Sequence, residues 1–153
     1  MNFDQLDSYI DGALARHRSL GLPEEMSPFK LVQASQTDID QTEQVLEVQL
    51  PEQYKEFMCR YGGGSFASLD LVPIVASIEF STNLASLNSR EERFALPFIA
   101  VAPVGTGDWW GFEVLEGICR NEVSFYSFED EVARIKYPNF LEFITREGLL
   151  VES

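Results

Sequence analysis

The stretch LPEQYKEFMCRYGGG, residues 50–64, decides the fold. A proline opens it, an apolar stripe fills its middle, and three consecutive glycines close it. Pro51 suits the start of a helix, where its fixed φ fits and no hydrogen bond is lost. The apolar residues recur at i, i+3, i+4 and i+7, and they are Tyr54, Phe57, Met58 and Tyr61. This spacing predicts a helix with one face in the core.

The three glycines have a structural explanation. Gly62 is placed to end the helix in the left-handed conformation, which glycine adopts without a Cβ penalty. The other two allow a tight reversal into the first predicted strand, residues 69–72. A phosphate-binding loop would need the opposite order, a strand, then glycines, then a helix. The glycine run therefore favours a role in folding over a role in phosphate binding.

The remaining residues predict helices on both sides of a group of strands. The expected helices are 2–20, capped by Asn2 and ended at Gly21, then 37–48, capped by Thr37, a short helix within 74–89, and 139–147. The expected later strands are 98–102, 109–115 and 122–128, and residues 22–36 are expected to be a loop. Short turns at 105–108 and 117–121 imply antiparallel pairing.

These elements predict an α+β fold in a single domain over residues 1–153. We expect a single antiparallel or mixed sheet of about four to six strands, with helices packed on it. The length and the apolar content of 45% are sufficient for a packed core without a disulfide or metal.

The charge balance is strongly acidic, with 25 acidic and 11 basic residues and a net charge of −14. Residues 1–61 hold 11 acids and 5 bases, and residues 62–153 hold 14 and 6, so the acidity is spread along the chain. Such a surface repels nucleic acid and anionic lipid and attracts a basic protein. We therefore expect no direct nucleic-acid or membrane partner. The alternative is that the charge serves only solubility.

Neither cysteines nor targeting signals suggest an exported protein. Cys59 and Cys119 lie in apolar surroundings and are predicted to be buried free thiols in a reducing compartment. The start, MNFDQLDSYIDG, lacks the basic and apolar regions of a signal peptide, and no apolar run approaches a membrane span. The expected location is the cytoplasm.

Motifs for catalysis, metals and cofactors are missing from the sequence. The sole histidine, His17, lies at the basic end of the first predicted helix, where a cationic group favours the helix dipole. Carboxylate runs at 91–92 and 129–131 are typical of solvated faces in an acidic chain. We therefore predict a protein that is not an enzyme and that has no catalytic residues, cofactor or metal.

Trp109 and Trp110 follow Asp108 at the start of a predicted strand. Neighbouring side chains on a strand point to opposite faces, so one tryptophan is expected in the core and the other outside it. An exposed tryptophan beside an acid is a plausible anchor for a protein partner. The alternative is that both rings pack within the protein.

The opening stretch resembles the central motif of the SUKH superfamily, the Smi/Knr-like proteins. Members have a helix, then Leu-Pro, a helix with the pattern Tyr-Lys-x-Phe, and a Gly-Gly turn into a strand. The matching residues are Leu50, Pro51, Tyr54, Lys55, Phe57, Gly62 and Gly63. FIAVAPVGTGDWWGFEV, SFYSFEDE and NFLEFI are similar to later parts of the family, so the resemblance covers about residues 37–147. Many members have Asn before the glycine pair, whereas this chain has Tyr61.

The resemblance implies binding rather than catalysis. Many bacterial members are immunity proteins that bind and block polymorphic toxins, often nucleases, and some fungal relatives are regulatory scaffolds in cell-wall signalling. The expected function is an immunity protein whose partner is a basic toxin domain. The alternatives are a regulatory scaffold of the Smi/Knr type and a small-ligand or catalytic groove beside Trp109.

The candidate partner contacts are acids and one aromatic near loops and strand ends of the central region. They are Asp70, Glu79, Glu91, Glu92, Asp108 and Trp109. The motif residues are assigned instead to folding, and these are Pro51, Tyr54, Phe57, Gly62 and Gly63.

Overall fold

The computed structural model describes residues 1–76, 82–89 and 93–151. In this part of the chain the helices are α1 (Phe3–Ser19), the 3₁₀ turn η1 (Glu24–Met26), α2 (Gln36–Leu46), α3 (Glu52–Arg60), α4 (Leu84–Asn88), α5 (Phe140–Phe143) and the π-helical turn η2 (Ile144–Gly148). The strands are β1 (Phe29–Val32), β2 (Gly63–Phe66), β3 (Leu69–Leu71), β4 (Phe98–Pro103), β5 (Trp109–Leu115), β6 (Ile118–Cys119), β7 (Val123–Ser127) and β8 (Val132–Tyr137).

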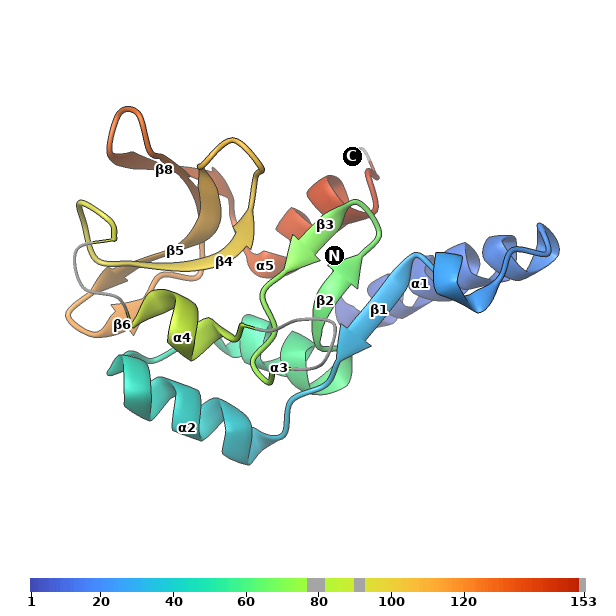
Figure 1. The fold of residues 1–153 in the computed structure, drawn as a ribbon, viewed down its shortest axis with the longest axis horizontal. Helices are drawn as coiled ribbons and strands as arrows, with labels where there is room; N and C mark the ends of the chain where they lie inside the picture. Colours follow the sequence, from blue (N-terminus) through green and yellow to red (C-terminus); the bar gives the residue numbers. More distant parts are fainter. Residues whose placement is uncertain (77–81, 90–92, 152–153) are drawn as a thin grey trace.

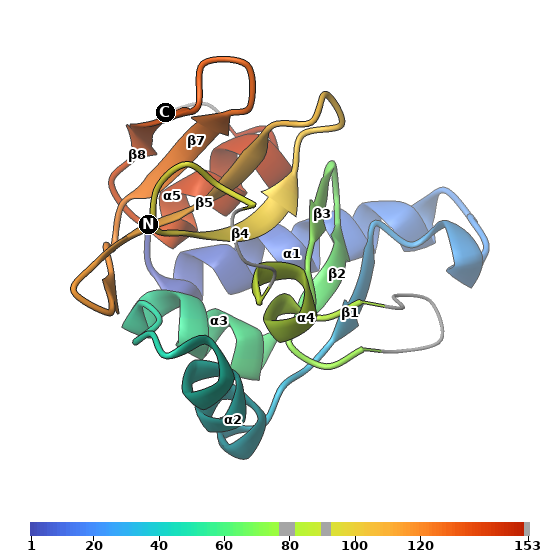
Figure 2. The same cartoon turned by 60° about the vertical axis from the view of Figure 1, so that its left-hand side comes forward.

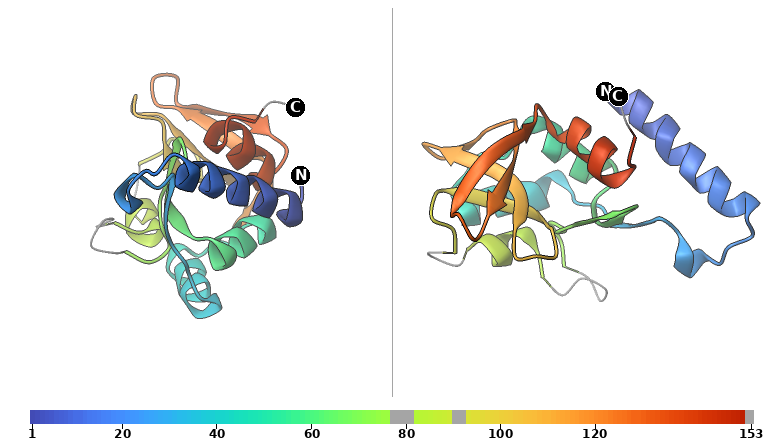
Figure 3. Two further views of the ribbon diagram at one scale, coloured as in Figure 1. Left: turned by 90° about the vertical axis from the view of Figure 1, so that its right-hand side faces the viewer. Right: turned by 90° about the horizontal axis from the view of Figure 1, so that it is seen from above.

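The strands form two antiparallel sheets. One has the order β1-β2-β3, and the other has the order β4-β5-β7-β8, with β6 paired to β5. The sheets meet where the Val72 N–H, just after β3, donates to the Val101 carbonyl of β4 at 2.8 Å. The five-stranded sheet and α1 lie at opposite ends of the long axis (Figures 1 and 3). The α+β class and antiparallel pairing predicted from the sequence are confirmed, but the strands are divided between two sheets rather than joined in one.

Helix α3 packs against both sheets. The Tyr54 ring packs against Phe112 of β5 with centroids 5.4 Å apart, and the Phe57 ring packs against Phe66 of β2 at 5.6 Å. Both rings also contact Phe140 of α5, at 5.0 and 5.1 Å respectively. All of these side chains are at most 1% exposed, so the predicted apolar stripe of this helix forms the centre of the core.

The glycine run lets three backbone segments approach closely. Gly62 has a φ of +103°, and a Cβ at this position would overlap the carbonyl of Val32. A Cβ on Gly63 would lie 2.5 Å from the Cα of Pro73. The glycine run was predicted only to reverse the chain. It also forms part of a sheet, because Gly63 and Gly64 are the first half of the central strand β2.

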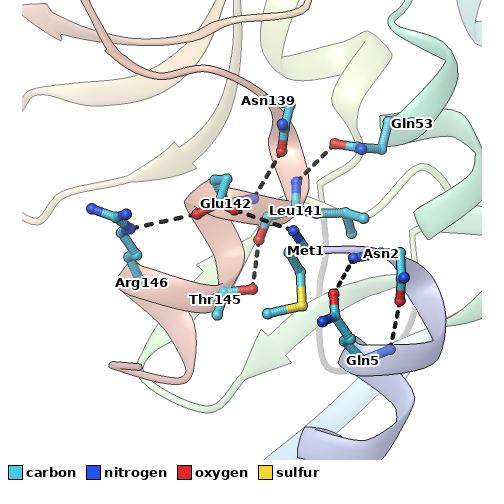
Figure 4. Close-up of polar contacts among 9 residues, drawn as sticks. All are labelled: Met1, Asn2, Gln5, Gln53, Asn139, Leu141, Glu142, Thr145 and Arg146. Atoms are coloured by element: carbon cyan, nitrogen blue, oxygen red, sulfur yellow. Dashed lines mark hydrogen bonds and ion pairs between the residues drawn. The ribbon is translucent and has the colours of Figure 1, made fainter. Parts of the chain in front are cut away.

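A polar network fixes α5 against α3 and the start of α1 (Figure 4). The Leu141 N–H donates to the Gln53 side chain at 2.9 Å. The Glu142 carboxylate lies between the Met1 amino group, at 3.4 Å, and Arg146, at 3.5 Å. These contacts hold the closing helix over the core, where Phe140 is 1% exposed.

Helix α1 matches the sequence prediction closely, whereas α2 starts earlier than predicted. Asn2 caps α1 through a capping box with Gln5, and Gly21 follows with a φ of +65°. The cap of α2 is Ser35, paired with Asp38, and not Thr37. Both positions carry the Ser/Thr-x-x-Asp pattern, and β1 ends only three residues before Ser35, which places the earlier one at the helix start.

Candidate protein-binding surface

Two turns lie side by side at one end of the five-stranded sheet (Figures 1 and 2). They comprise residues 103–109, between β4 and β5, and residues 127–132, between β7 and β8, and we call them the hairpin end. Strand pairing sets them together, because Trp109 is opposite Tyr126 on β7 and Pro103 on β4.

Asp108 holds the two turns together. One carboxylate oxygen accepts a hydrogen bond from the Phe128 N–H at 2.9 Å, across the turns, and the other accepts from the Thr106 hydroxyl at 2.7 Å. The bond from Phe128, followed by that from Thr106, lowers the pKa of the Asp108 carboxyl. Each carboxylate oxygen is thus already bonded within the protein, so Asp108 acts chiefly as a positioning residue for its neighbours.

The second turn directs a run of acids into solvent. The Glu131 N–H donates to the Ser127 carbonyl at 2.8 Å, and Glu131 has a φ of +57°. The Asp130 N–H donates to the Ser127 hydroxyl at 3.3 Å. Glu129, Asp130 and Glu131 are all exposed, and their one described ion pair is a long contact of 4.0 Å between Asp130 and Arg134. An exposed pair of this length neutralises the charge only weakly.

Large apolar side chains are exposed among these acids. Phe128 is 65% exposed, and Val104 and Val132 are each 37% exposed. Protein interfaces are enriched in aromatic residues and have a polar rim, and an exposed phenylalanine with charged groups around it has both features. The hairpin end can therefore bind a partner by burying Phe128 while its carboxylates meet cationic groups.

The two tryptophans lie on opposite faces of β5, and both are half-buried. Trp110 packs against Phe143 at 5.2 Å and Phe125 at 5.1 Å. The guanidinium of Arg93 lies 5.1 Å from the centre of the Trp109 ring. The predicted division between faces is correct, but neither ring is freely exposed, so the exposed aromatic of this region is Phe128 rather than Trp109.

The other predicted contacts are not gathered at the hairpin end. Asp70 is exposed on β3, opposite Ser65, in the other sheet. Glu79, Glu91 and Glu92 lie outside the described residues. Of the predicted set, the structure brings together Asp108 and Trp109.

The exposure of Phe128 was not predicted, because the sequence pattern placed this residue in the strand 122–128. Strand β7 ends at Ser127, which places Phe128 in the turn. The available signal was the acidic run that follows, since three charged residues in a row are typical of a turn rather than a strand.

A groove of about 500 Å³ lies along α3, beside Phe3 of α1 and Gln36 of α2. Its lining is mostly polar and charged, and comprises Phe3, Gln36, Glu52, Gln53, Lys55, Glu56 and Cys59. Cys59 is half-buried there, contrary to the prediction of a buried thiol, whereas Cys119 is buried and burial raises its pKa to about 12. None of these lining residues belongs to the hairpin end.

Other kinds of site find little support among the described residues. His17 is 9% exposed and its Nε2 lies 3.1 Å from the Pro23 carbonyl, so its ring fixes the end of α1. No group of three or more His, Cys, Asp or Glu residues in the described ranges could hold a metal ion. No described helix combines the length and apolar character needed to cross a bilayer.

Comparison with protein families places the central part of the chain. A family model, SUKH_6, described as SMI1-KNR4 cell-wall, matches residues 36–144. This segment begins at the first residue of α2 and runs to the end of α5, so it includes the glycine run and the hairpin end but not α1 or β1. No curated protein matches the chain.

Proposed function

Because the chain belongs to the SMI1-KNR4 family of the SUKH superfamily, we propose that it is an immunity protein that binds a toxin domain and neutralises it. The partner is a basic domain, of the kind found in nucleases, whose phosphate-binding cleft is positively charged. The protein acts in the cytoplasm by stoichiometric binding and not by turnover of a substrate.

The observation that supports this proposal most directly is the exposed Phe128 among acids. Burial of an aromatic at the centre of an interface contributes much of the binding free energy, and surrounding polar groups exclude water. Asp108 holds the Phe128 backbone through a hydrogen bond, so the anchor is presented by an ordered turn. An ordered anchor loses less conformational entropy on binding than a mobile one.

The net charge of −14 attracts a basic partner before the two proteins touch. Opposite charge on the partner raises the association rate, and salt reduces this effect because it screens exposed charges. At the hairpin end the acids at 129–131 would compete with phosphate for the cationic groups of a nuclease cleft.

The proposal is tested by a search of the adjoining reading frames for a secreted protein with a basic C-terminal domain, followed by co-expression of that domain with this chain in a bacterium and by binding of the purified proteins. We expect the wild-type chain to relieve toxicity. Phe128→Ala should weaken binding about thirtyfold, the usual loss at an interface anchor. Leu115→Ala is the matched control, because Leu115 is 68% exposed at the tip of a different hairpin, β5–β6. If the domain neither binds nor is neutralised, the immunity role is wrong.

Charge variants locate the electrostatic contribution. Glu129→Lys with Asp130→Lys should slow association at low salt much more than Asp11→Lys with Glu116→Lys, which changes the net charge equally and alters exposed acids elsewhere. Equal slowing by both pairs would show that only overall charge acts, and would remove the hairpin end from the interface.

A second candidate function is a regulatory module of the Smi/Knr type. The family description refers to the cell wall, which favours this role. Such a module would bind several proteins of its own cell. Pull-down from that cell with wild-type and Phe128→Ala chains distinguishes the two roles, since a regulatory module would retain endogenous partners in the absence of any toxin.

A further inference from the structure

Among the described strands, β1 pairs with β2 alone and is therefore the outer strand of the three-stranded sheet (Figure 2). In antiparallel pairs, residues alternate between those whose backbone groups bond to the partner strand and those whose groups point away from it. The Ala67 N–H donates to the Pro28 carbonyl at 2.7 Å, so Pro28 and Ala67 form a hydrogen-bonded pair. The alternation along β1 is counted from this pair. With the register Lys30↔Ser65, the groups of Phe29 and Leu31 therefore point outward.

One of these outward pairs is already satisfied. The Ser27 hydroxyl donates to the Phe29 carbonyl at 3.2 Å and accepts from the Phe29 N–H at 3.4 Å. Leu31 has no corresponding side-chain partner among the described residues. Its N–H donor and carbonyl acceptor are thus available at the open edge of the sheet.

A groove of about 340 Å³ runs along this edge, and Leu31 is part of its lining. Glu24 and Glu25 of η1 line the groove, and Lys30 is the one base among its lining residues. Leu22 and Met26, at either side of these acids in the chain, are 39% and 60% exposed. The groove thus combines an open backbone edge, a net negative charge and neighbouring apolar side chains.

We propose that the β1 edge binds an extended, positively charged segment of a partner protein, which adds to the sheet as a fourth strand. Backbone hydrogen bonds to Leu31 would hold the segment in place, and Glu24 and Glu25 would select cationic side chains. This mode of recognition depends on main-chain hydrogen bonds for affinity and on side chains for specificity.

Electrostatic repulsion makes a segment of another protein a better partner for this edge than a second copy of this chain. Pairing of two β1 strands would place the strand of each copy in the groove that Glu24 and Glu25 of the other copy line, and would join two molecules that each carry −14. Like charges at short range oppose association. The β1 edge lies outside the family-matched residues 36–144, and its binding does not depend on the hairpin end or on the immunity role.

The test uses a capped peptide of alternating lysine and valine, about seven residues long, and its glutamate–valine counterpart. Amide exchange and NMR shifts are measured on the full chain. In the free protein the Leu31 amide should exchange faster than the amides of Lys30 and Val32. The lysine peptide should slow Leu31 exchange at least tenfold at saturation and the glutamate peptide should not.

Two variants separate the backbone and charge contributions. Leu31→Pro removes the outward N–H without removing a bond to β2 and should weaken peptide binding about tenfold, as expected for an edge proline. Glu24→Gln with Glu25→Gln leaves the backbone unchanged and should weaken binding of the lysine peptide while improving that of the glutamate peptide. This double variant tests the proposal if Leu31→Pro does not fold.

Any one of four results would overturn the proposal. The first three are equal binding of both peptides, shifts that map to residues away from β1, and no binding at millimolar peptide. Concentration-dependent self-association that Leu31→Pro abolishes would also overturn it, because the edge would then belong to a second copy.

Discussion

The first three residues of the central strand of the three-stranded sheet carry almost no side-chain volume, whereas the central strands of the five-stranded sheet carry large rings along their length. β2 begins Gly63-Gly64-Ser65 and lies against backbone atoms of its neighbours. In the five-stranded sheet, Trp110 and Phe125 meet on one face, and Tyr126 meets Phe98 on the other at 5.5 Å.

This difference extends to what each sheet can offer a partner. The five-stranded sheet ends in turns that present side chains, with Phe128 and its acidic neighbours as the anchor. The three-stranded sheet presents backbone groups at Leu31. Side-chain recognition tolerates variation in the strands behind it, whereas close backbone packing tolerates very little.

The largest effect is expected at the glycine run. Gly62→Ala should lower the free energy of unfolding by about 4 kcal/mol, because the new Cβ meets the Val32 carbonyl and the backbone has a positive φ. Urea unfolding measures the change. Gly12→Ala is the control, since Gly12 is inside α1 with open space around it, and this change should stabilise the protein by about 0.5–1 kcal/mol. A Gly62→Ala variant of normal stability would contradict the close packing.

A smaller loss is expected for a conservative change among the rings of the other sheet. Phe98→Leu should cost about 1.5 kcal/mol, because Phe98 is 6% exposed but leucine fills much of the same volume. The measurement is again urea unfolding. A cost equal to that of Gly62→Ala would remove the distinction between the two sheets.

Two tyrosines should respond in opposite directions to loss of a hydroxyl. The Tyr54 hydroxyl is buried without a hydrogen-bond partner in the described structure, so Tyr54→Phe should raise the free energy of unfolding by about 1 kcal/mol. The Tyr126 hydroxyl accepts from the Ala95 N–H at 3.0 Å, so Tyr126→Phe should lower it by about 1 kcal/mol. Calorimetry of both variants checks the pair, and a loss at Tyr54 would show that its hydroxyl has a partner.

The smallest expected effect is the pH dependence at the hairpin end. The pKa of Asp108 is lowered in the folded state, so the carboxylate contributes stability above its ordinary pKa of about 3.9, and the contribution is lost as the pH falls through the folded value. Asp108→Asn should therefore be less stable than wild type at neutral pH, and the difference should shrink below about pH 3.9. A constant difference across acid titration would contradict this assignment.

Local sequence signals predicted the central helix of the fold but not all of the strands. The α3 stripe and Gly62 were predictable because apolar spacing and glycine report directly on helix packing and helix ends. β1, β2, β6 and β8 were missed: β1 was expected to be part of a loop, and the glycines of β2 were expected to form a reversal. β6 is only two residues long, and β8 reads VARIKY on an exposed edge, where burial imposes no alternation.

The candidate site was predictable in its location and not in its anchor. Asp108 beside Trp109 indicated a turn entering an aromatic strand, and the structure has this turn. The exposure of Phe128 depends on where β7 ends and on the bond from its N–H to Asp108, twenty residues earlier in the chain. Such a long-range contact leaves no periodic pattern in the sequence.

The position of α3 has a consequence for how the protein unfolds. Tyr54 contacts the five-stranded sheet and Phe57 contacts the three-stranded sheet. Neither sheet can therefore separate from α3 without exposing the packed face of the other sheet. Slow-exchanging amides of both sheets should therefore open together, in a single cooperative event. The amides in the middle of α1, where Asp11 and Gly12 are exposed, should exchange faster than those of the two sheets.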